Sequence, residues 1–313
     1  MGASGNRVRL GPLVLALAMA GCVAAPPVRS PAPEPRPDLP APQPSDESRA
    51  LAAYYRGVEN NLTARGLMRT DGGGPDVPFS KRQLVEDFIR IALYDEYVTN
   101  GAAMIPHATE SQLRRWEIPV RMGLVFGDTI PEAQRREDRA TIRRYARRLS
   151  RVTGHPISLG TPDNANFQIL VLNEDERLAF APALERLVPG IDRMAVRTII
   201  RMPRSTFCLV FAFSKGDSAS YSRAVAVIRG EHPDALRRSC IHEELAQGLG
   251  LANDSPTARP SIFNDDEEFA LLTRHDEMLL RMLYDPRLEP GMRADEARPI
   301  LRQIADELLG GDS

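Results

Sequence analysis

The spacing of apolar and polar residues predicts helices and strands in a definite order along the chain. Two helices are expected first, over 48–67 and from Ser80 onward, where a serine hydroxyl can cap the helix start. A β-rich run over 118–126 predicts a strand. The residues after it, 131–152, place apolar side chains three and four positions apart, as in an amphipathic helix.

The second half of the chain predicts more strands and then more helices. Strands are expected over 157–159, 167–172, 207–213 and 223–228, and helices over 235–249 and 273–284. Asp234 can cap the first of these helices, and Gly250 suits a sharp turn after it. This order favours an α+β domain over 111–313 with a mixed sheet, preceded by a helical lead-in over 48–110.

The first residues read as a targeting segment. An apolar run over 10–20 follows Arg7 and Arg9 and is about half as long as a bilayer-spanning helix. Small residues come directly before Cys22, which predicts a signal peptide over 1–21 and a lipid on Cys22. The alternative is an ordinary secretory signal with an incidental cysteine.

A proline-rich tether is predicted over 22–47. Nine of the nineteen residues over 26–44 are proline, so this stretch favours extended polyproline II and reaches on the order of 60 Å. We expect a protein of the cell envelope that is lipid-anchored and faces the periplasm. Val23, after the cysteine, slightly favours the outer membrane. The lipid is then the expected contact with the membrane.

Charge and cysteine content narrow the partners and the compartment. The net charge is −2 and basic residues are spread along the chain, which argues against a nucleic-acid partner. Outside Cys22 two cysteines remain, Cys208 and Cys240. In an oxidising compartment they predict a disulfide; the alternative is two buried free thiols.

The segment 240–254 carries the candidate chemistry. His242-Glu243 suggests a zinc-peptidase helix, but the second histidine that would share the ion is replaced by Ala246. Shifting the motif by one residue preserves every spacing. Glu243 and Gln247 then share a helix face, Glu244 occupies the position of the catalytic glutamate, and Asn253 or Asp254 follows the turn at Gly250.

With these spacings the sequence resembles the metzincin group of zincin metallopeptidases over about 110–290. The resemblance implies a mixed twisted sheet, a site helix beneath it and a small C-terminal helical subdomain. It implies that Glu244 is catalytic if the protein is active. It also places Ser261 and Phe263 in the turn below the metal, with Phe263 at the position of the group's methionine.

A narrower resemblance rests on three further stretches together with the lipoprotein signal. They are Cys-Ile-x-Glu-Glu-x-x-Gln-x-Leu-Gly-Leu-x-Asn-Asp, Ser-Ile-Phe-Asn-Asp and Leu-Tyr-Asp-Pro-Arg-Leu-x-Pro-Gly-Met. In these the chain resembles the proteobacterial putative lipoproteins catalogued as domain of unknown function 2927. That family has no established activity, so the resemblance bears on fold and location.

The candidate metal ligands are oxygen donors only. They are the carboxylates of Glu243 and Asp254 and the amides of Gln247 and Asn253. Without imidazole nitrogens the affinity for zinc should fall greatly, so we expect either no cofactor or a harder divalent metal. The alternative for Glu243, Gln247 and Asn253 is hydrogen bonding to loops.

Two nearby residues also have ordinary structural alternatives. Glu244 can be a solvated helix glutamate. His242 is expected at the surface near the helix start.

Three functions are compatible with the sequence. The leading hypothesis is a non-catalytic envelope lipoprotein that uses a peptidase-like cleft to bind a peptide or an envelope protein. The alternative is an active metallopeptidase with Glu/Gln/Asn ligands, in which Glu244 is the general base. The third is a structural envelope lipoprotein.

Overall fold

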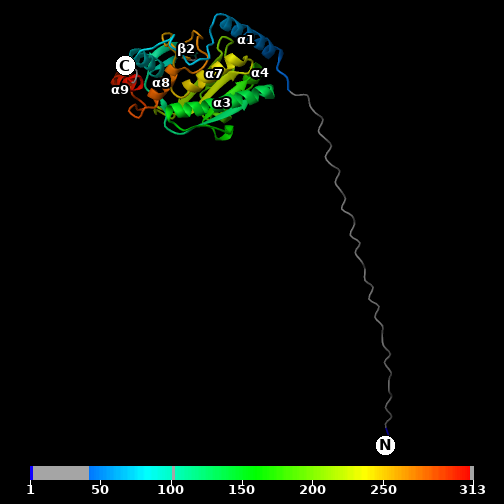
Figure 1. The fold of residues 1–313 in the computed structure, drawn as a ribbon. Coiled ribbons are helices and arrows are strands. Elements are labelled where there is room, and N and C mark those ends of the chain that lie inside the picture. The colour runs from blue at the N-terminus through cyan, green and yellow to red at the C-terminus, as the bar shows by residue number, and fades with distance from the viewer. Residues whose placement is uncertain (3–41, 101–102, 311–313) are drawn as a thin grey trace. The chain divides into compact units, whose positions relative to one another are not determined.

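The computed structural model of the chain describes residues 1–2, 42–100 and 103–310. The chain divides into two compact units, Met1–Pro40 and Ala41–Ser313, and the second carries the helices and strands given below (Figure 1). The predicted signal peptide, Cys22 and most of the predicted tether lie outside the described residues. In the part that is described, no helix combines the length and the apolar character needed to cross a membrane.

The lead-in region contains the two predicted helices, α1 (Asp46–Ala64) and α2 (Lys81–Ala92). Ser80 caps α2 as predicted, because its Oγ accepts a hydrogen bond from the Gln83 backbone N–H. In turn, the Gln83 side-chain oxygen accepts a hydrogen bond from the Ser80 backbone N–H. An antiparallel hairpin follows that the sequence pattern did not predict, formed by β1 (Tyr94–Asn100) and β2 (Ala103–Glu110).

A mixed sheet forms the centre of the domain, as predicted. Its strands are β3 (Arg115–Trp116), β4 (Val120–Phe126), β5 (Ile157–Gly160), β6 (Phe167–Leu172), β7 (Cys208–Ser214) and β8 (Ser220–Arg229). The order is β3-β8-β6-β4-β5, with all of these neighbours parallel. β7 pairs antiparallel with β8 and runs along it from Cys208 to Ser214. The predicted strands all occur, within about three residues of the expected ends.

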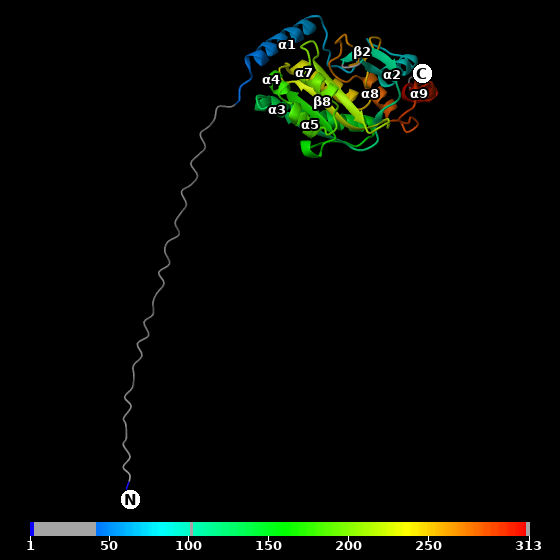
Figure 2. The same ribbon diagram turned by 180° about the vertical axis from the view of Figure 1, so that it is seen from behind.

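Helices cover both faces of the sheet. α3 (Glu132–Thr153) and α7 (Asp234–Gln247) lie on one face, and α5 (Ala181–Leu187) and α6 (Arg193–Ile200) on the other (Figures 1 and 2). Side chains of β6 alternate between the two layers. Ile169 joins the core under α3 and α7, whereas Leu170 joins the core under α5 and α6. The fold is therefore a mixed α/β arrangement with a largely parallel sheet.

The remaining elements complete these layers. The sheet connections also include η1 (Pro162–Asn164) and α4 (Glu174–Leu178). The chain closes with α8 (Arg274–Leu283), which was predicted, and α9 (Ala294–Leu309), which packs against α2. Thr273 and Asp276 cap α8 reciprocally, so its start is fixed by the sequence itself.

Candidate functional site

Helix α7 carries the predicted site residues Glu243, Glu244 and Gln247, and a residue of another helix contacts its first turn. The residue before the helix, Pro233, supplies no side-chain cap. Asp234 is the first helical residue and binds Arg237 instead, so the predicted Asp234 cap was wrong. The carboxylate of Glu59, on α1, accepts a hydrogen bond from the Leu236 backbone N–H at 2.9 Å. The lead-in thus supplies a partner for one of the unpaired N–H groups at the start of α7.

The end of α7 depends on a glycine, as predicted, although the helix stops at Gln247 rather than at residue 249. Gly250 has a φ of +129°, a conformation that side chains disfavour. A Cβ there would also lie 2.2 Å from the Arg114 carbonyl oxygen. Glycine is therefore required for both backbone conformation and space, and the chain turns sharply after the site helix.

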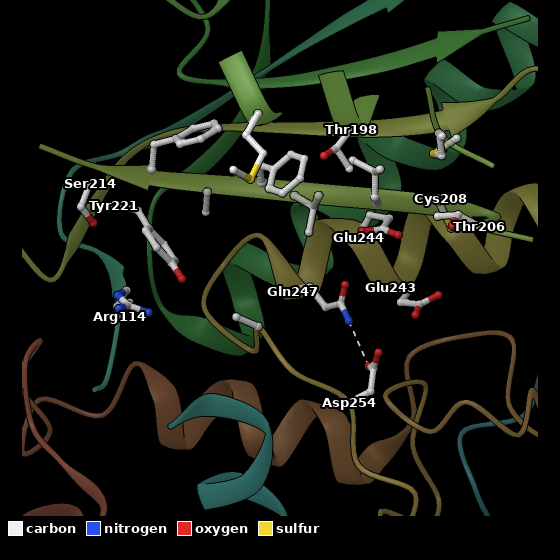
Figure 3. A pocket seen from close by; sticks show the side chains of 18 of the residues that line it. Arg114, Thr198, Thr206, Cys208, Ser214, Tyr221, Glu243, Glu244, Gln247 and Asp254 are labelled. Atoms are coloured by element: carbon white, nitrogen blue, oxygen red, sulfur yellow. Dashed lines mark hydrogen bonds between the residues drawn. The ribbon is translucent and has the colours of Figure 1, made fainter. Parts of the chain in front are cut away.

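A cleft of about 1020 Å³ runs along the whole of β7. Figure 3 shows its two ends. Glu243 and Glu244 lie near Cys208, at the start of β7, whereas Arg114 and Tyr221 lie near Ser214, at its end. The cleft wall is thus a sheet edge, and its floor is the site helix with the loops that follow it.

The predicted disulfide joins the cleft wall to the helix. Cys208 and Cys240 are bonded, with 5.8 Å between their Cα atoms. Cys208 Sγ and one carboxylate oxygen from each of Glu243 and Glu244 lie within 4.8 Å of one another. A disulfide sulfur is not a thiolate, so this trio offers a metal only its two carboxylates.

Three of the four predicted oxygen donors meet in the cleft. Glu243, Gln247 and Asp254 all line it, and Gln247 Nε2 donates to Asp254 Oδ1 at 3.0 Å (Figure 3). Burial, followed by the charges of Glu244, Asp254, Glu267 and Asp265, raises the pKa of Glu243 well above its usual value.

The fourth predicted donor, Asn253, is directed elsewhere. Its side-chain nitrogen donates to the Arg90 carbonyl oxygen at 2.8 Å, and its backbone N–H donates to the Ile91 carbonyl oxygen. Asn253 is buried and does not line the cleft. Asn253 thus connects the loop after α7 to the end of α2. This is a structural hydrogen-bonding role, the alternative to metal binding given above for Asn253.

Glu244 and His242 are both more buried than a solvated glutamate and a surface histidine would be. Glu244 is 3% exposed and lines the cleft, so it is not a solvated helix glutamate. His242 is buried rather than at the surface, and its ring stacks on Tyr145 with 3.9 Å between centroids. Its Nδ1 accepts the Leu272 backbone N–H. Burial and then the charges of Arg148 and Arg238 lower the pKa of His242 to about 3, so the ring is neutral.

The predicted turn below the site is anchored to α8. Ser261 Oγ donates to Asp276 Oδ1 at 2.6 Å, and the Ile262 N–H donates to the other oxygen of the same carboxylate. Ser261 Oγ also accepts the Phe263 N–H. Ser261 and Phe263 are both buried and do not line the cleft, so their contribution is to hold the segment that packs around the site helix.

Sequence reasoning missed two acidic residues of the cleft, Asp265 and Glu267. The signal was present as a run of four acidic residues over 265–268. Glu267 has a positive φ of 59°, unusual for a residue with a side chain. Burial and the neighbouring carboxylates of Asp265 and Asp266 raise its pKa to about 7.

These residues do not fit a zinc ion. The donors in the cleft are oxygens, Cys208 is held in a disulfide, and the His242 ring lies against Tyr145 with Nδ1 already accepting a hydrogen bond. Zinc sites in proteins are built from imidazole and thiolate with few carboxylates. The cleft can instead present several carboxylates to a cationic group.

Comparison with known proteins adds a family and no activity. A family model described as a protein of unknown function (DUF2927) matches residues 81–303, from the first residue of α2 into α9. No curated protein and no solved structure matches the chain.

Proposed function

Because the chain belongs to the family described as proteins of unknown function, DUF2927, we propose a function from the geometry of the cleft. The protein is an envelope lipoprotein that binds an extended peptide segment of a partner without cleaving it. The observation that carries the proposal is the position of β7. In the described part of the chain this strand pairs with β8 alone, and its other edge faces the cleft.

An open strand edge offers backbone N–H and C=O groups to another strand. All seven residues of β7 line the cleft and are partly exposed. Val210 and Ala212 pack toward α7, and Phe211 and Phe213 pack toward α6. The strand is therefore fixed on both faces and open only along its edge, where a peptide of about eight residues could pair with it.

The donor set argues against catalysis. The metallopeptidase alternative needs Glu243, Gln247 and either Asn253 or Asp254 around one ion. Asn253 is bound to α2, and Asp254 already accepts a hydrogen bond from Gln247. The remaining donors are oxygens without an imidazole, a set that binds zinc weakly and so gives Glu244 little metal-bound water to deprotonate. The order β4, α3, β5, β6, β7, β8, α7, turn and α8 supports a zincin-like fold, so we propose a peptidase-like framework that retains a binding cleft.

The test uses fluorescein-labelled octapeptides with uncharged ends, in which valine and serine alternate and one central residue is varied. The peptide that binds best is then made in two forms, one N-methylated at its odd positions and one at its even positions. Alternate residues of a strand direct their N–H groups to the partner, so one form should lose binding by about tenfold or more and the other should not. Fluorescence anisotropy measures both.

The catalytic alternative is tested on the same samples. We expect little zinc in the purified protein, no cleavage of the peptides, and unchanged binding of a peptide with an uncharged central residue in Glu244→Gln. Equal binding of the two N-methylated forms, or no peptide binding at all, contradicts the proposal. Stoichiometric metal lost in Glu243→Ala, together with cleavage abolished by Glu244→Gln, establishes a metallopeptidase instead.

A further inference from the structure

One end of the cleft is lined by carboxylates from three separate segments. α7 contributes Glu243 and Glu244, the loop after it contributes Asp254, and the loop after the buried turn contributes Asp265 and Glu267. Figure 3 shows Glu243, Glu244 and Asp254 gathered below the first part of β7. We call these five residues the acidic end of the cleft.

The groups of the acidic end act on one another. Burial and the four other carboxylates all raise the pKa of Glu243. Burial and Asp265 raise the pKa of Glu267 to about 7, with Asp266 contributing from the same loop. A positive charge placed among these groups would replace repulsion by attraction and favour their ionised forms. The acidic end is therefore electrostatically complementary to a cation.

The edge strand determines how a cation could arrive there. Side chains along an extended peptide alternate, so every second one points to the same face. The face of β7 toward α7 carries Cys208, Val210 and Ala212. A peptide residue beside Cys208 on that face would project its side chain over Glu243 and Glu244, whose carboxylate oxygens lie within 4.8 Å of the Cys208 sulfur.

We propose that the cleft selects extended peptides that carry a lysine or arginine beside the start of β7, with the cationic group bound by Glu243, Glu244 and the rest of the acidic end. This inference rests on the proposed peptide-binding function and adds the chemical class of the ligand. A side-chain cation suits the site better than zinc, because an ammonium or guanidinium group is satisfied by oxygen acceptors alone.

The experiment compares four octapeptides of the alternating valine and serine series, in EDTA. Their central residue is lysine, arginine, norleucine or glutamate. We expect the lysine and arginine peptides to bind at least about tenfold more tightly than the norleucine peptide, and the glutamate peptide to bind least. The preference should disappear in the double variant Glu243→Gln, Glu244→Gln.

A control variant removes one carboxylate outside the cleft. Glu185 is exposed on α5 and outside the cleft, and Glu185→Gln should retain the full preference. Circular dichroism melts check that each variant folds. If the double variant does not fold, Glu267→Gln, which changes a loop residue, replaces it and should reduce the preference severalfold.

The outcomes separate this inference from the proposed function. If no peptide binds, the peptide-binding function itself fails. If lysine and norleucine peptides bind equally, binding stands and the cation preference is overturned. A preference that survives in both the double variant and Glu267→Gln also overturns it. Without EDTA, stoichiometric calcium or zinc uptake that the double variant abolishes and the lysine peptide leaves unchanged would assign the carboxylates to a metal.

Discussion

At the scale of single residues, Gly250 and Ser80 take their roles from their own backbone and side-chain chemistry, whereas Asn253 and His242 take theirs from contacts with distant elements. Gly250 was expected at a turn because glycine tolerates positive φ, and Ser80 was expected to cap α2; both predictions were confirmed. Asn253 and His242 show the limit. Their environments are set by Arg90 on α2 and Tyr145 on α3, far away in sequence, so motif spacing could not reveal them.

His275 offers a test at this scale. It is fully buried, with Nε2 3.1 Å from Asp87 and Nδ1 3.8 Å from Asp276. Burial lowers its pKa, but these two carboxylates outweigh burial and raise the pKa to about 9, from 6.5 in the unfolded chain. The charged ring thus stabilises the fold fully below pH 6.5, and this contribution is lost as the pH rises through 9.

We therefore expect the unfolding free energy of the wild type to fall between pH 6 and pH 10. Because residue 275 cannot titrate in His275→Gln, the fall in that variant should be smaller, by on the order of 3 kcal/mol. Urea unfolding at several pH values measures the difference. Parallel pH profiles for the two proteins would contradict the assignment of a charged His275.

At the scale of elements, the order of strands and helices followed from periodicity, while their lateral pairing did not. Apart from Gln168 the run 167–172 is apolar, and 224–228 is apolar throughout, which is typical of strands buried on both faces. The short elements α4 to α6 and β3 were missed because they carry too few residues to show a period. The β1 and β2 hairpin was missed because it contains Asp95, Glu96 and Pro106, residue types that are depleted in strands. Helix α9 was not predicted either. The edge position of β7 arises from long-range pairing.

The contact between α1 and α7 gives a prediction for elements. Glu59 accepts the Leu236 N–H at the start of the site helix. Glu59→Ala leaves that N–H without this partner and should lower the unfolding free energy by about 1 kcal/mol, as the loss of a helix cap does. Glu59→Gln keeps an acceptor oxygen and should retain most of the stability.

Asn60→Ala, at an exposed neighbouring position of α1, is the matched control. Chemical denaturation compares the three variants. If Asn60→Ala and Glu59→Ala destabilise the protein equally, the effect belongs to α1 itself and not to its contact with α7.

For the whole molecule, the sequence identified the family and the mixed sheet, and both were confirmed. The location stays a prediction, because Cys22 lies outside the described residues. We expect Cys22→Ser to release the protein from membranes, since a lipid on this cysteine is the predicted anchor. Membrane fractionation and the intact mass of the mature protein measure this. Unchanged fractionation and an unchanged mass would contradict lipidation.

The bond between Cys208 and Cys240 also bears on the thermodynamics of recognition. It holds the first residue of β7 to the site helix, so the conformational entropy of that strand end is lost when the disulfide forms and not when a peptide binds. A preorganised wall lowers the entropic cost of association. Oxidation of Cys208 and Cys240 would thus prepare the cleft for the proposed peptide.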